Sequence, residues 1–343
     1  MLKKQDKGME RLNRLILHPD FDRTIQELSN RNVFLPDYGD VDAPHVLNFT
    51  TTGQLIANIE EIKPNKLNAK NGCDKVSEYL FSAYDESIMK FMALEGTAYF
   101  TTHSLVVAGT YEYIPILYAV FNFYTRAEYI VAKSAYIKHA LDPEIESKRD
   151  YMNDRLNFLL KYSPIKSVLF IDGPLIGGNL YTIAVDNNSR FLDREVIPIY
   201  IVKNSSSDIV TQNIESLKGK YNSDMHWLQT FLKPGERSCF FKYEDQVNKK
   251  NCKVFCYLKA FNTSPQRIEM HIDTYKQYGK SIETILDIIY YLFLVQGAIS
   301  NSQIRPIAIA EAYARTAIKL INIKKYFEKL NITPTMNQVR FGG

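Results

Sequence analysis

The stretch SVLFIDGPLIGG, residues 167–178, decides how the middle of the chain folds. Its four consecutive apolar residues, VLFI, lack the alternation of a half-exposed strand and are typical of a strand covered on both faces. The run stops at one carboxylate, Asp172, and a Gly-Pro step then turns the chain. We interpret the stretch as a buried strand that carries an acid to the edge of a sheet. The alternative is an ordinary Asp-Gly turn, whereas a phosphate-binding loop would need a Gly-Lys-Ser/Thr ending that DGPLIGGN does not have.

The elements on either side of this strand are also predictable. Asp142 is a suitable N-cap, Pro143 fits the first helical position, and acidic residues follow in the first turn, so a helix is expected to about residue 162. Beyond the strand, VIPIYIVK at residues 196–203 is a second unalternating apolar run, which ends at Lys203. A helix around Asp193 is expected between the two strands, and together they predict a mixed sheet.

Strand-like texture begins at residue 91 and continues along most of the chain. The runs FMALEGTAYF, SLVVAGTYEY and IPILYAVFNFY are joined by short turns, which predicts an antiparallel meander. Further strands are predicted in SCFFKYE, CKVFCYLKAF and QRIEMHI, and helices at residues 281–298, 306–320 and 322–330. Residues 1–90 show mainly helix-period apolar positions, including KVSEYLFSAYDESIMKFM at 75–92. We therefore predict a helical N-terminal extension over residues 1–90, a main domain over 91–330 and a tail over 331–343.

Composition narrows the classes of protein. Lys and Arg number 42 against 38 Asp and Glu, so nucleic-acid binding would have to come from local patches rather than from a basic coat. The four cysteines form no CxxC pair and the six histidines no spaced metal motif, which favours reduced thiols and a cytoplasmic protein. The N-terminus lacks a signal-peptide core, and the apolar segment at residues 288–299 is shorter than the ~20 residues that span a bilayer. We expect no membrane segment and read 288–299 as a buried helix.

The order of the predicted elements points to one fold class. Three antiparallel strands, a helix, a buried strand ending in Asp, another strand and C-terminal helices form the arrangement of ribonuclease-H-like nucleases. The fold predicted is therefore α/β, with a ribonuclease-H-like mixed sheet flanked by helices. Such enzymes need acids from separate elements, because two divalent metals ~3.5–4 Å apart share carboxylates that meet at one point.

A length estimate tests whether the helix after Asp142 could supply one of these acids. From Asp154 to the helix end is about 12 Å at ~1.5 Å per residue, and the returning strand covers about 16 Å at ~3.3 Å per residue. Helix and strand thus return to the same level, although Asp150 fits the distance equally well. The position of Asp154 one turn before Phe158, beside the apolar arc of the helix, favours Asp154. The alternative is that both acids belong to a solvated face.

Four short motifs, ALEGT, FIDGPL, PIYIVK and SQIRPIAIAEAY, together resemble those of the NurA family of DNA-end-processing nucleases. The resemblance implies a ribonuclease-H-like fold of the PIWI-like kind. ALEGT, with Glu95, looks like the family's Asp-Gly-Ser strand, and FIDGPL, with Asp172, is similar to its LLDGSL strand. PIYIVK, with Lys203, corresponds to a family strand that ends in lysine. An Arg-x-Glu step is matched by Arg267 and Glu269, and SQIRPIAIAEAY, with Glu311, looks like the final signature. Together these motifs cover roughly residues 91–320.

The sequence also departs from the family pattern. Glu95 replaces the expected Asp, Asp154 would replace a helical Glu, Gln303 stands where the family has Tyr, and Glu311 stands where it has His. Each of the three acidic positions keeps a carboxylate, and Glu311 can still bind a hard cation through oxygen. These departures leave a working nuclease as the favoured interpretation.

The resemblance implies a metal-dependent DNA nuclease that acts on DNA ends or single strands, in DNA repair or phage defence. Glu95, Asp154 and Asp172 would hold Mn²⁺ or Mg²⁺ and Glu311 would complete the catalytic set. Lys203 and Arg267 would contact phosphates. The alternatives are that Lys203 is a solvated strand end, that Arg267 forms a cross-strand ion pair with Glu269, and that Glu311 faces water on a surface helix. The implied partners are DNA, a second copy of the chain and a hexameric HerA-type ATPase, since the chain has no Walker motif of its own. The alternatives are a catalytically weakened nucleic-acid-binding or regulatory subunit of a motor complex, and a structural subunit that acts through its first 90 residues.

Overall fold

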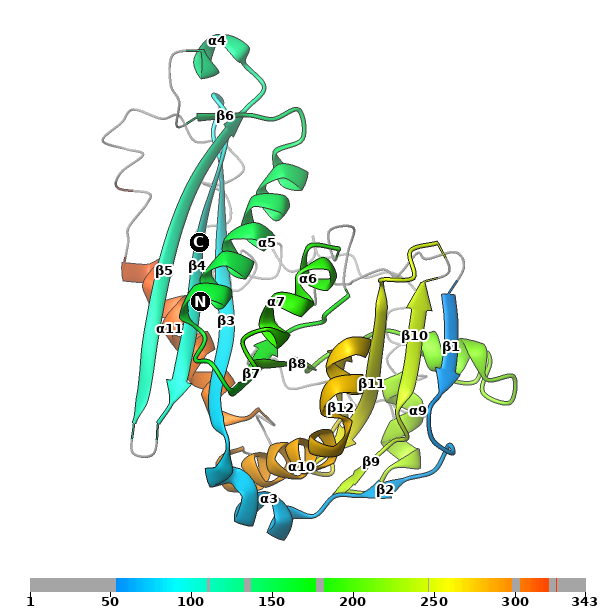
Figure 1. Cartoon of the computed structure of the whole chain (residues 1–343). Helices are drawn as coiled ribbons and strands as arrows, with labels where there is room; N and C mark the ends of the chain where they lie inside the picture. Colours follow the sequence, from blue (N-terminus) through cyan, green and yellow to red (C-terminus); the bar gives the residue numbers. More distant parts are fainter. Residues whose placement is uncertain are drawn as a thin grey trace, which may run out of the picture. The chain divides into compact units, whose positions relative to one another are not determined.

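The computed structural model describes residues 54–109, 112–132, 137–176, 182–245, 247–297 and 303–320, together with Lys325. Within these residues one mixed sheet runs through the molecule in the order β1-β10-β11-β12-β8-β7-β3-β4-β5-β6, and helices cover both of its faces (Figure 1). None of the helices in this described part is both long enough and apolar enough to cross a membrane.

One half of the sheet has the ribonuclease-H-like order. Three long strands form an antiparallel meander: β3 (Leu80–Met92), β4 (Thr97–Ala108) and β5 (Tyr113–Thr125). The chain then forms α5 (Pro143–Tyr162) and returns as β7 (Ser167–Asp172), which lies parallel beside β3. Next, β8 (Ile197–Val202) adds a second parallel strand beside β7. The fold class predicted from the sequence is confirmed.

The other half of the sheet is antiparallel. Its strands continue outward from β8 as β12 (Gln266–His271), β11 (Cys252–Lys259), β10 (Phe241–Asp245) and β1 (Gln54–Asn58). Short strands extend the edges: β2 (Asn65–Lys66), β9 (Glu236–Arg237) and β6 (Ile137–His139). The remaining helices are α3 (Ala69–Lys75), a 3-10 turn (Val76–Glu78), α4 (Glu128–Val131), α6 (Thr182–Asp186), α7 (Asn188–Leu192), α8 (Ile209–Asn213), α9 (Asp224–Phe231), α10 (Ile272–Gln296) and α11 (Arg305–Leu320).

The central strands are buried on both faces, and alternate residues enter different cores. On β7, Leu169 and Ile171 pack into the core that contains the buried residues of α5, whereas Val168 and Phe170 pack into the core that contains those of α10. Because side chains alternate along a strand, Asp172 continues the second set. The acid at the end of β7 therefore lies on the α10 face of the sheet.

Helix α5 begins as predicted. The Asp142 side chain accepts hydrogen bonds from the main-chain N–H groups of Glu144 and Ile145, and Pro143 occupies the first turn. Pro143 fits there because the first N–H groups of a helix have no intrahelical partner. The strand predictions for β7, β8, β10, β11 and β12 are confirmed as well.

The predicted helix over residues 75–92 is wrong for most of its length, because residues 80–92 form β3. Its apolar residues also fit a helical period, but pairing with β7 on one side and β4 on the other decides the conformation. The predicted boundary at residue 90 therefore falls inside a central strand. The other helical segments predicted before residue 54 lie outside the described residues, as does all of the 322–330 helix except Lys325.

The turn between β3 and β4 also differs from the prediction, which placed a strand across it. The main-chain N–H of Ala93 donates to the carbonyl of Gly96 at 2.9 Å and closes a tight turn. A Cβ on Gly96 would lie 2.3 Å from the carbonyl oxygen of Tyr124, so only glycine allows β5 to approach this closely. Glu95 thus lies in a turn rather than on a strand.

Candidate metal centre

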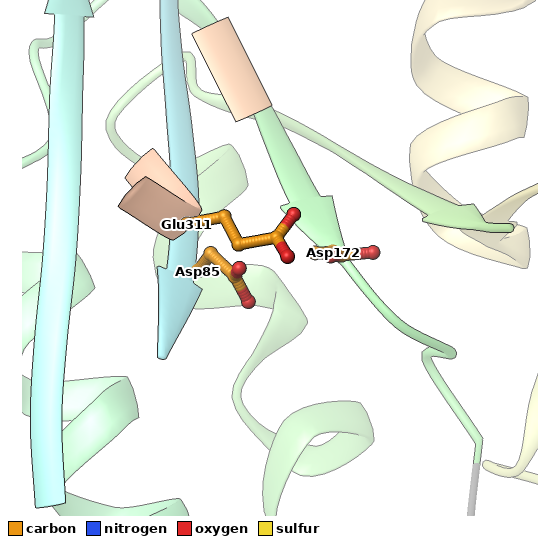
Figure 2. A group of neighbouring side chains, drawn as sticks. All are labelled: Asp85, Asp172 and Glu311. Carbon is orange, nitrogen blue, oxygen red and sulfur yellow. The ribbon is translucent and has the colours of Figure 1, made fainter. Parts of the chain in front are cut away.

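Three carboxylates from distant parts of the chain converge at the end of β7. One oxygen each from Asp85, Asp172 and Glu311 lies within 4.8 Å of the other two. Figure 2 shows Asp85 on β3, Asp172 at the tip of β7 and Glu311 reaching toward both from α11. Among the residues that the structure describes, this is the one group of three or more potential metal ligands.

The strand register explains why Asp85 and Asp172 meet. β3 and β7 are parallel and pair Tyr84 with Ile171, so the next residue on each strand is an aspartate. Neighbouring strands lie about 4.8 Å apart, and side chains of equal parity point to the same face. Asp85 comes two residues after Ala83, and Asp172 two residues after Phe170, and both of these apolar residues belong to the α10-side core. The two acids therefore lie on that face together.

Small residues bring the third carboxylate to the sheet. Ala310, Ala314 and Ala317 are buried on α11, and their short side chains let the helix approach the strands closely. The hydroxyl of Thr102 on β4 donates to the carbonyl of Ala314 at 2.8 Å. This contact fixes the helix along its length, and Glu311 is thereby held over the tip of β7 (Figure 2).

Lys203 joins the cluster from the end of β8. Its Nζ lies 2.7 Å from Asp172 Oδ2 and 3.1 Å from Glu311 Oε2. Glu311 has two further partners, because Gln303 Nε2 donates to Oε2 at 3.0 Å and Arg315 lies 2.8 Å from Oε1. The lysine therefore bridges two of the three acids.

The electrostatics of the cluster favour a bound cation. Burial, followed by the nearby Asp172 and Glu86 charges, raises the pKa of Asp85 to about 9. Burial also raises the pKa of Asp172, against the effect of Lys203. Burial opposes the charge on Lys203, but Asp172 and Glu311 outweigh it and raise its pKa. Closely spaced carboxylates repel one another, so positive charge placed among them is stabilised.

Of the predicted site residues, Asp172, Glu311 and Lys203 are brought together, and Glu95 and Asp154 are not. Asp85 occupies the place in the cluster that was expected of Glu95. Glu95 lies beyond the end of β3, and that end is about 23 Å from Asp85 along the strand at ~3.3 Å per residue. Asp85-Glu86-Ser87 keeps the first and third residues of the Asp-Gly-Ser motif. That match could have identified the strand, but the helical interpretation of residues 75–92 concealed it.

Helix α5 offers the sheet an arginine and a tyrosine instead of an acid. Tyr151 donates to Glu86, and the Arg155 guanidinium lies 5.2 Å from the ring centre of Tyr84. Asp154 is rotated away from these residues and lies near Asp150, and burial followed by that like charge raises its pKa. Asp150 accepts hydrogen bonds from Tyr124 at 2.5 Å and from Lys138 at 2.6 Å. Neither of the two candidate helical acids joins the cluster.

Arg267 is not placed to contact a phosphate. It is 1% exposed, and its Nε lies 2.6 Å from Glu269 Oε1 while Nη1 donates to Ser205 at 2.8 Å. The ion pair with Glu269 that was the alternative for Arg267 does form, although within β12 rather than across two strands, and it commits the guanidinium to buried partners.

A family model supports what this arrangement suggests. The NurA domain matches residues 99–316, which is more than half of the chain. The chain belongs to the NurA family. The matched segment includes Asp172, Lys203 and Glu311 and begins after Asp85, and membership makes the chain a nuclease by class.

Solved structures with similar folds include nucleases of two kinds. The NurA nuclease from Sulfolobus solfataricus shares 14% identity at a TM-score of 0.48, over 75% of this chain and 89% of that one. A NurA structure bound to dAMP and manganese shares 11% identity at a TM-score of 0.38, over 91% and 93% of the two chains. Endonuclease V from Bacillus subtilis shares 10% identity at a TM-score of 0.37, over 92% and 95%. No curated protein matches the sequence.

The donor set of the NurA-family cluster fits a divalent metal. All three ligands are carboxylate oxygens, which are the donors that Mg²⁺ and Mn²⁺ prefer. The Asp172 side chain is 18% exposed and that of Glu311 is 23% exposed, so the cluster can exchange ions with solvent. Asp85, Asp172 and Glu311 are the residues that would hold the ion.

Proposed function

We propose that this NurA-family nuclease is a metal-dependent deoxyribonuclease that hydrolyses phosphodiester bonds at DNA ends or in single strands. One observation carries the proposal: three carboxylate oxygens from β3, β7 and α11 lie within 4.8 Å of one another. Convergence of acids from separate elements is the arrangement that metal-assisted phosphodiester hydrolysis requires.

The chain's own residues have separate tasks in this reaction. Asp85 and Asp172 come from paired strands and provide a rigid base, whereas Glu311 on α11 closes the cluster from above the sheet. A divalent ion, Mn²⁺ or Mg²⁺, would supply positive charge that polarises the scissile phosphate and acidifies the attacking water. Lys203, with its side chain 26% exposed, would turn its ammonium group from the acids toward a DNA phosphate once the ion has entered.

A cleavage assay tests this proposal directly. Linear and single-stranded DNA are incubated with the protein in Mn²⁺, in Mg²⁺ or in EDTA. Cleavage is expected with metal and not with EDTA, and Asp172→Asn is expected to abolish it. Asp154→Asn serves as the matched control because Asp154 lies on α5, outside the cluster. Undiminished cleavage by the Asp172 variant would remove the cluster from the mechanism.

A second candidate function is that of a weakened nuclease fold that binds nucleic acid or regulates a motor. It is favoured by Lys203, whose ammonium group already bridges two of the acids and could replace the ion. Calorimetry separates the two functions. Retention of DNA without measurable Mn²⁺ binding would support the second candidate, whereas Mn²⁺ binding that disappears in Asp172→Asn supports the first.

We further propose that the enzyme works as a homodimer fed with DNA by a HerA-type ATPase, in DNA repair or phage defence. The sequence has no Walker motif, so any translocation must be driven by another protein. The β5 strand exposes apolar side chains that suit an interface, including Ile114, Leu117, Tyr118 and Phe121. The four cysteines are all free, as is usual in a reducing compartment such as the cytoplasm.

Mass measurement and a coupled assay test these partners. A mass of twice the chain and ATP-dependent stimulation of DNA degradation by a co-expressed motor are expected. A stable monomer that no neighbouring-encoded ATPase stimulates would remove the partner proposal and leave the metal centre intact.

A further inference from the structure

A buried ion cluster lies on the face of the sheet opposite the cluster of Asp85, Asp172 and Glu311. Lys253 Nζ from β11 and Arg267 Nε from β12 each lie 2.6 Å from Glu269 Oε1. The three side chains are at most 2% exposed. Arg267 and Glu269 alternate along β12 with Ile268 and Met270, which pack into the α10-side core. Their own side chains therefore point to the other face.

The two carboxylate oxygens of Glu269 have different partners. Oε1 binds both cations, whereas Oε2 accepts a hydrogen bond from the main-chain N–H of Leu175 at 2.9 Å. Leu175 lies three residues after Asp172, beyond the end of β7 and two residues past Gly173, whose main-chain N–H still donates to the Ile201 carbonyl of β8 at 3.0 Å. Burial disfavours the charged form of Glu269, but Lys253 and Arg267 outweigh it and lower its pKa, so Glu269 remains an anionic acceptor.

Arg267 makes the corresponding contact to the next loop. Its Nη1 donates to the hydroxyl of Ser205 at 2.8 Å, two residues after Lys203. That hydroxyl also accepts from the main-chain N–H of Ser207 at 3.1 Å. Glu269 thus contacts the loop that follows Asp172, and Arg267 contacts the loop that follows Lys203. These are two loops that leave the carboxylate cluster.

We propose that Arg267 and Glu269 are positioning residues for the metal centre, with Glu269 fixing the loop after Asp172 and Arg267 fixing the loop after Lys203. The inference rests on the proposed function, and neither residue touches DNA or the ion. Groups that orient metal ligands from behind typically change metal affinity or activity by about 10- to 100-fold when they are lost. A cluster that only stabilised the core would leave ligand geometry unaffected.

A matched pair of variants tests the role of Glu269. Glu60 offers the control because it also accepts from an arginine, Arg237, and from a main-chain N–H, that of Phe240, but holds neither loop. Glu269→Gln is expected to weaken Mn²⁺ binding and lower kcat about tenfold with KM for DNA unchanged. Glu60→Gln is expected to keep wild-type values. Hydrogen exchange at the Leu175 amide is expected to rise in the Glu269 variant alone, whether or not metal is present.

A gentler pair covers the case in which Glu269→Gln fails to fold. Ser205→Ala removes one hydroxyl contact to Arg267, and Ser206→Ala is its exposed neighbour. The Ser205 variant is expected to lose about threefold in kcat, less than the tenfold expected of Glu269→Gln because only one contact of Arg267 is removed, and Ser206→Ala to lose none.

The outcomes separate this inference from the function beneath it. The positioning role is overturned if Glu269→Gln and Glu60→Gln behave equally. Where Glu269→Gln does not fold, it is overturned if Ser205→Ala and Ser206→Ala behave equally. Wild-type protein that neither binds Mn²⁺ nor cleaves DNA overturns the proposed function instead. In that case the Leu175 exchange experiment still decides whether Glu269 anchors the loop.

Discussion

Two clusters of charged side chains occupy opposite faces of one sheet, and they differ in how their charge is balanced. In the first cluster, the acids Asp85, Asp172 and Glu311 lie around Lys203. The side chains of Asp172, Glu311 and Lys203 are 18–26% exposed. The second cluster sets Lys253 and Arg267 against Glu269, is at most 2% exposed, and has Asp224 nearby as a further acid. The first cluster has three acids, one with its pKa raised to about 9, and access to solvent, whereas the second is balanced and enclosed.

The difference shows which ion clusters can do chemistry. A buried charge is tolerated only when partners neutralise it and satisfy its hydrogen bonds. The Lys253–Glu269–Arg267 cluster meets that condition within the chain and needs nothing further. The carboxylate cluster meets it only partly, because one lysine bridges two acids and Asp85 is left with a raised pKa. An incoming cation would complete the balance.

The largest expected effect is a loss of DNA cleavage without a loss of stability when an acid of the carboxylate cluster is changed. Asp85→Asn is expected to reduce DNA cleavage by about 10²–10³-fold or more, because each 1.4 kcal/mol of lost transition-state stabilisation is tenfold and a bound metal contributes several. Unfolding measured by urea in EDTA is expected to show equal or greater stability, since one of three mutually repelling acids is gone. A strongly destabilised variant would show that the cluster is structural.

The enclosed cluster is expected to behave in the opposite way. Lys253→Met leaves Arg267 as the remaining cation on Glu269 and should lower the free energy of unfolding by about 3 kcal/mol, the lower end for broken buried pairs. The double variant with Glu269→Gln should cost less than the sum of the single variants, because they share one interaction. Additive losses in a double-mutant cycle would show that the two side chains do not stabilise each other.

Metal titration compares the two clusters in a single experiment. Mn²⁺ at a hundredfold excess over its dissociation constant should raise the free energy of unfolding by about 2.7 kcal/mol if it binds only the folded protein. The gain should disappear in Asp85→Asn and persist in Lys253→Met. A gain that survives the Asp85 change would place the ion elsewhere.

The fold was predictable wherever a local signal decided the conformation. The VLFI run, the second apolar run before Lys203 and the Asp142-Pro143 cap each contain enough information within a few residues, and all three elements form as predicted. β3 is different, because Leu80, Tyr84 and Ile88 recur at a helical spacing. Its strand conformation comes from pairing with β4 and with β7, whose residues lie far along the chain.

The site was predictable to the extent that strand ends and motifs locate it. Asp172, Lys203 and Glu311 were identified because strand ends converge and because the NurA resemblance placed them. Asp85 was missed because its strand was read as a helix. Asp154 was favoured over Asp150 because it lies beside the apolar arc of α5, but each residue is turned about 100° from the next around the helix axis, and the packed orientation of the helix decides which side chain faces the sheet. Packing against the sheet sets that rotation, and Tyr151 and Arg155 occupy the facing positions.

A buried histidine on the α5 side of the sheet provides a third reference. His103 is 0% exposed, its Nδ1 lies 2.7 Å from the Tyr84 hydroxyl, and burial followed by Arg155 lowers its pKa from 6.5 to about 3. Between these two values the unfolded chain binds a proton that the folded protein does not. Stability should therefore fall as pH drops below ~6.5, by up to about 1.4 kcal/mol per pH unit from this residue.

Comparison with His103→Gln isolates this contribution from those of the acids. Urea unfolding from pH 7 to pH 4 should show a shallower decline in the variant than in the wild type. Parallel curves would mean that His103 is protonated in the folded protein, and that burial alone does not keep a charge out of this core.

The smallest expected effect concerns the acid that the sequence placed in the metal centre. Glu95 lies in the turn after β3, and its Oε2 is buried without a hydrogen-bond partner among the described residues. Glu95→Gln should change cleavage by less than about twofold and leave stability equal or slightly higher, since a neutral amide costs less to bury without a partner than a carboxylate does. Asp85→Asn is the matched comparison, because each variant replaces a carboxyl group with an amide, and the two positions are only ten residues apart. A tenfold loss of cleavage in Glu95→Gln would mean that the turn after β3 reaches the reacting phosphate. Glu95, rather than the Asp85 that the pairing of β3 with β7 brings to the centre, would then be the acid that acts there.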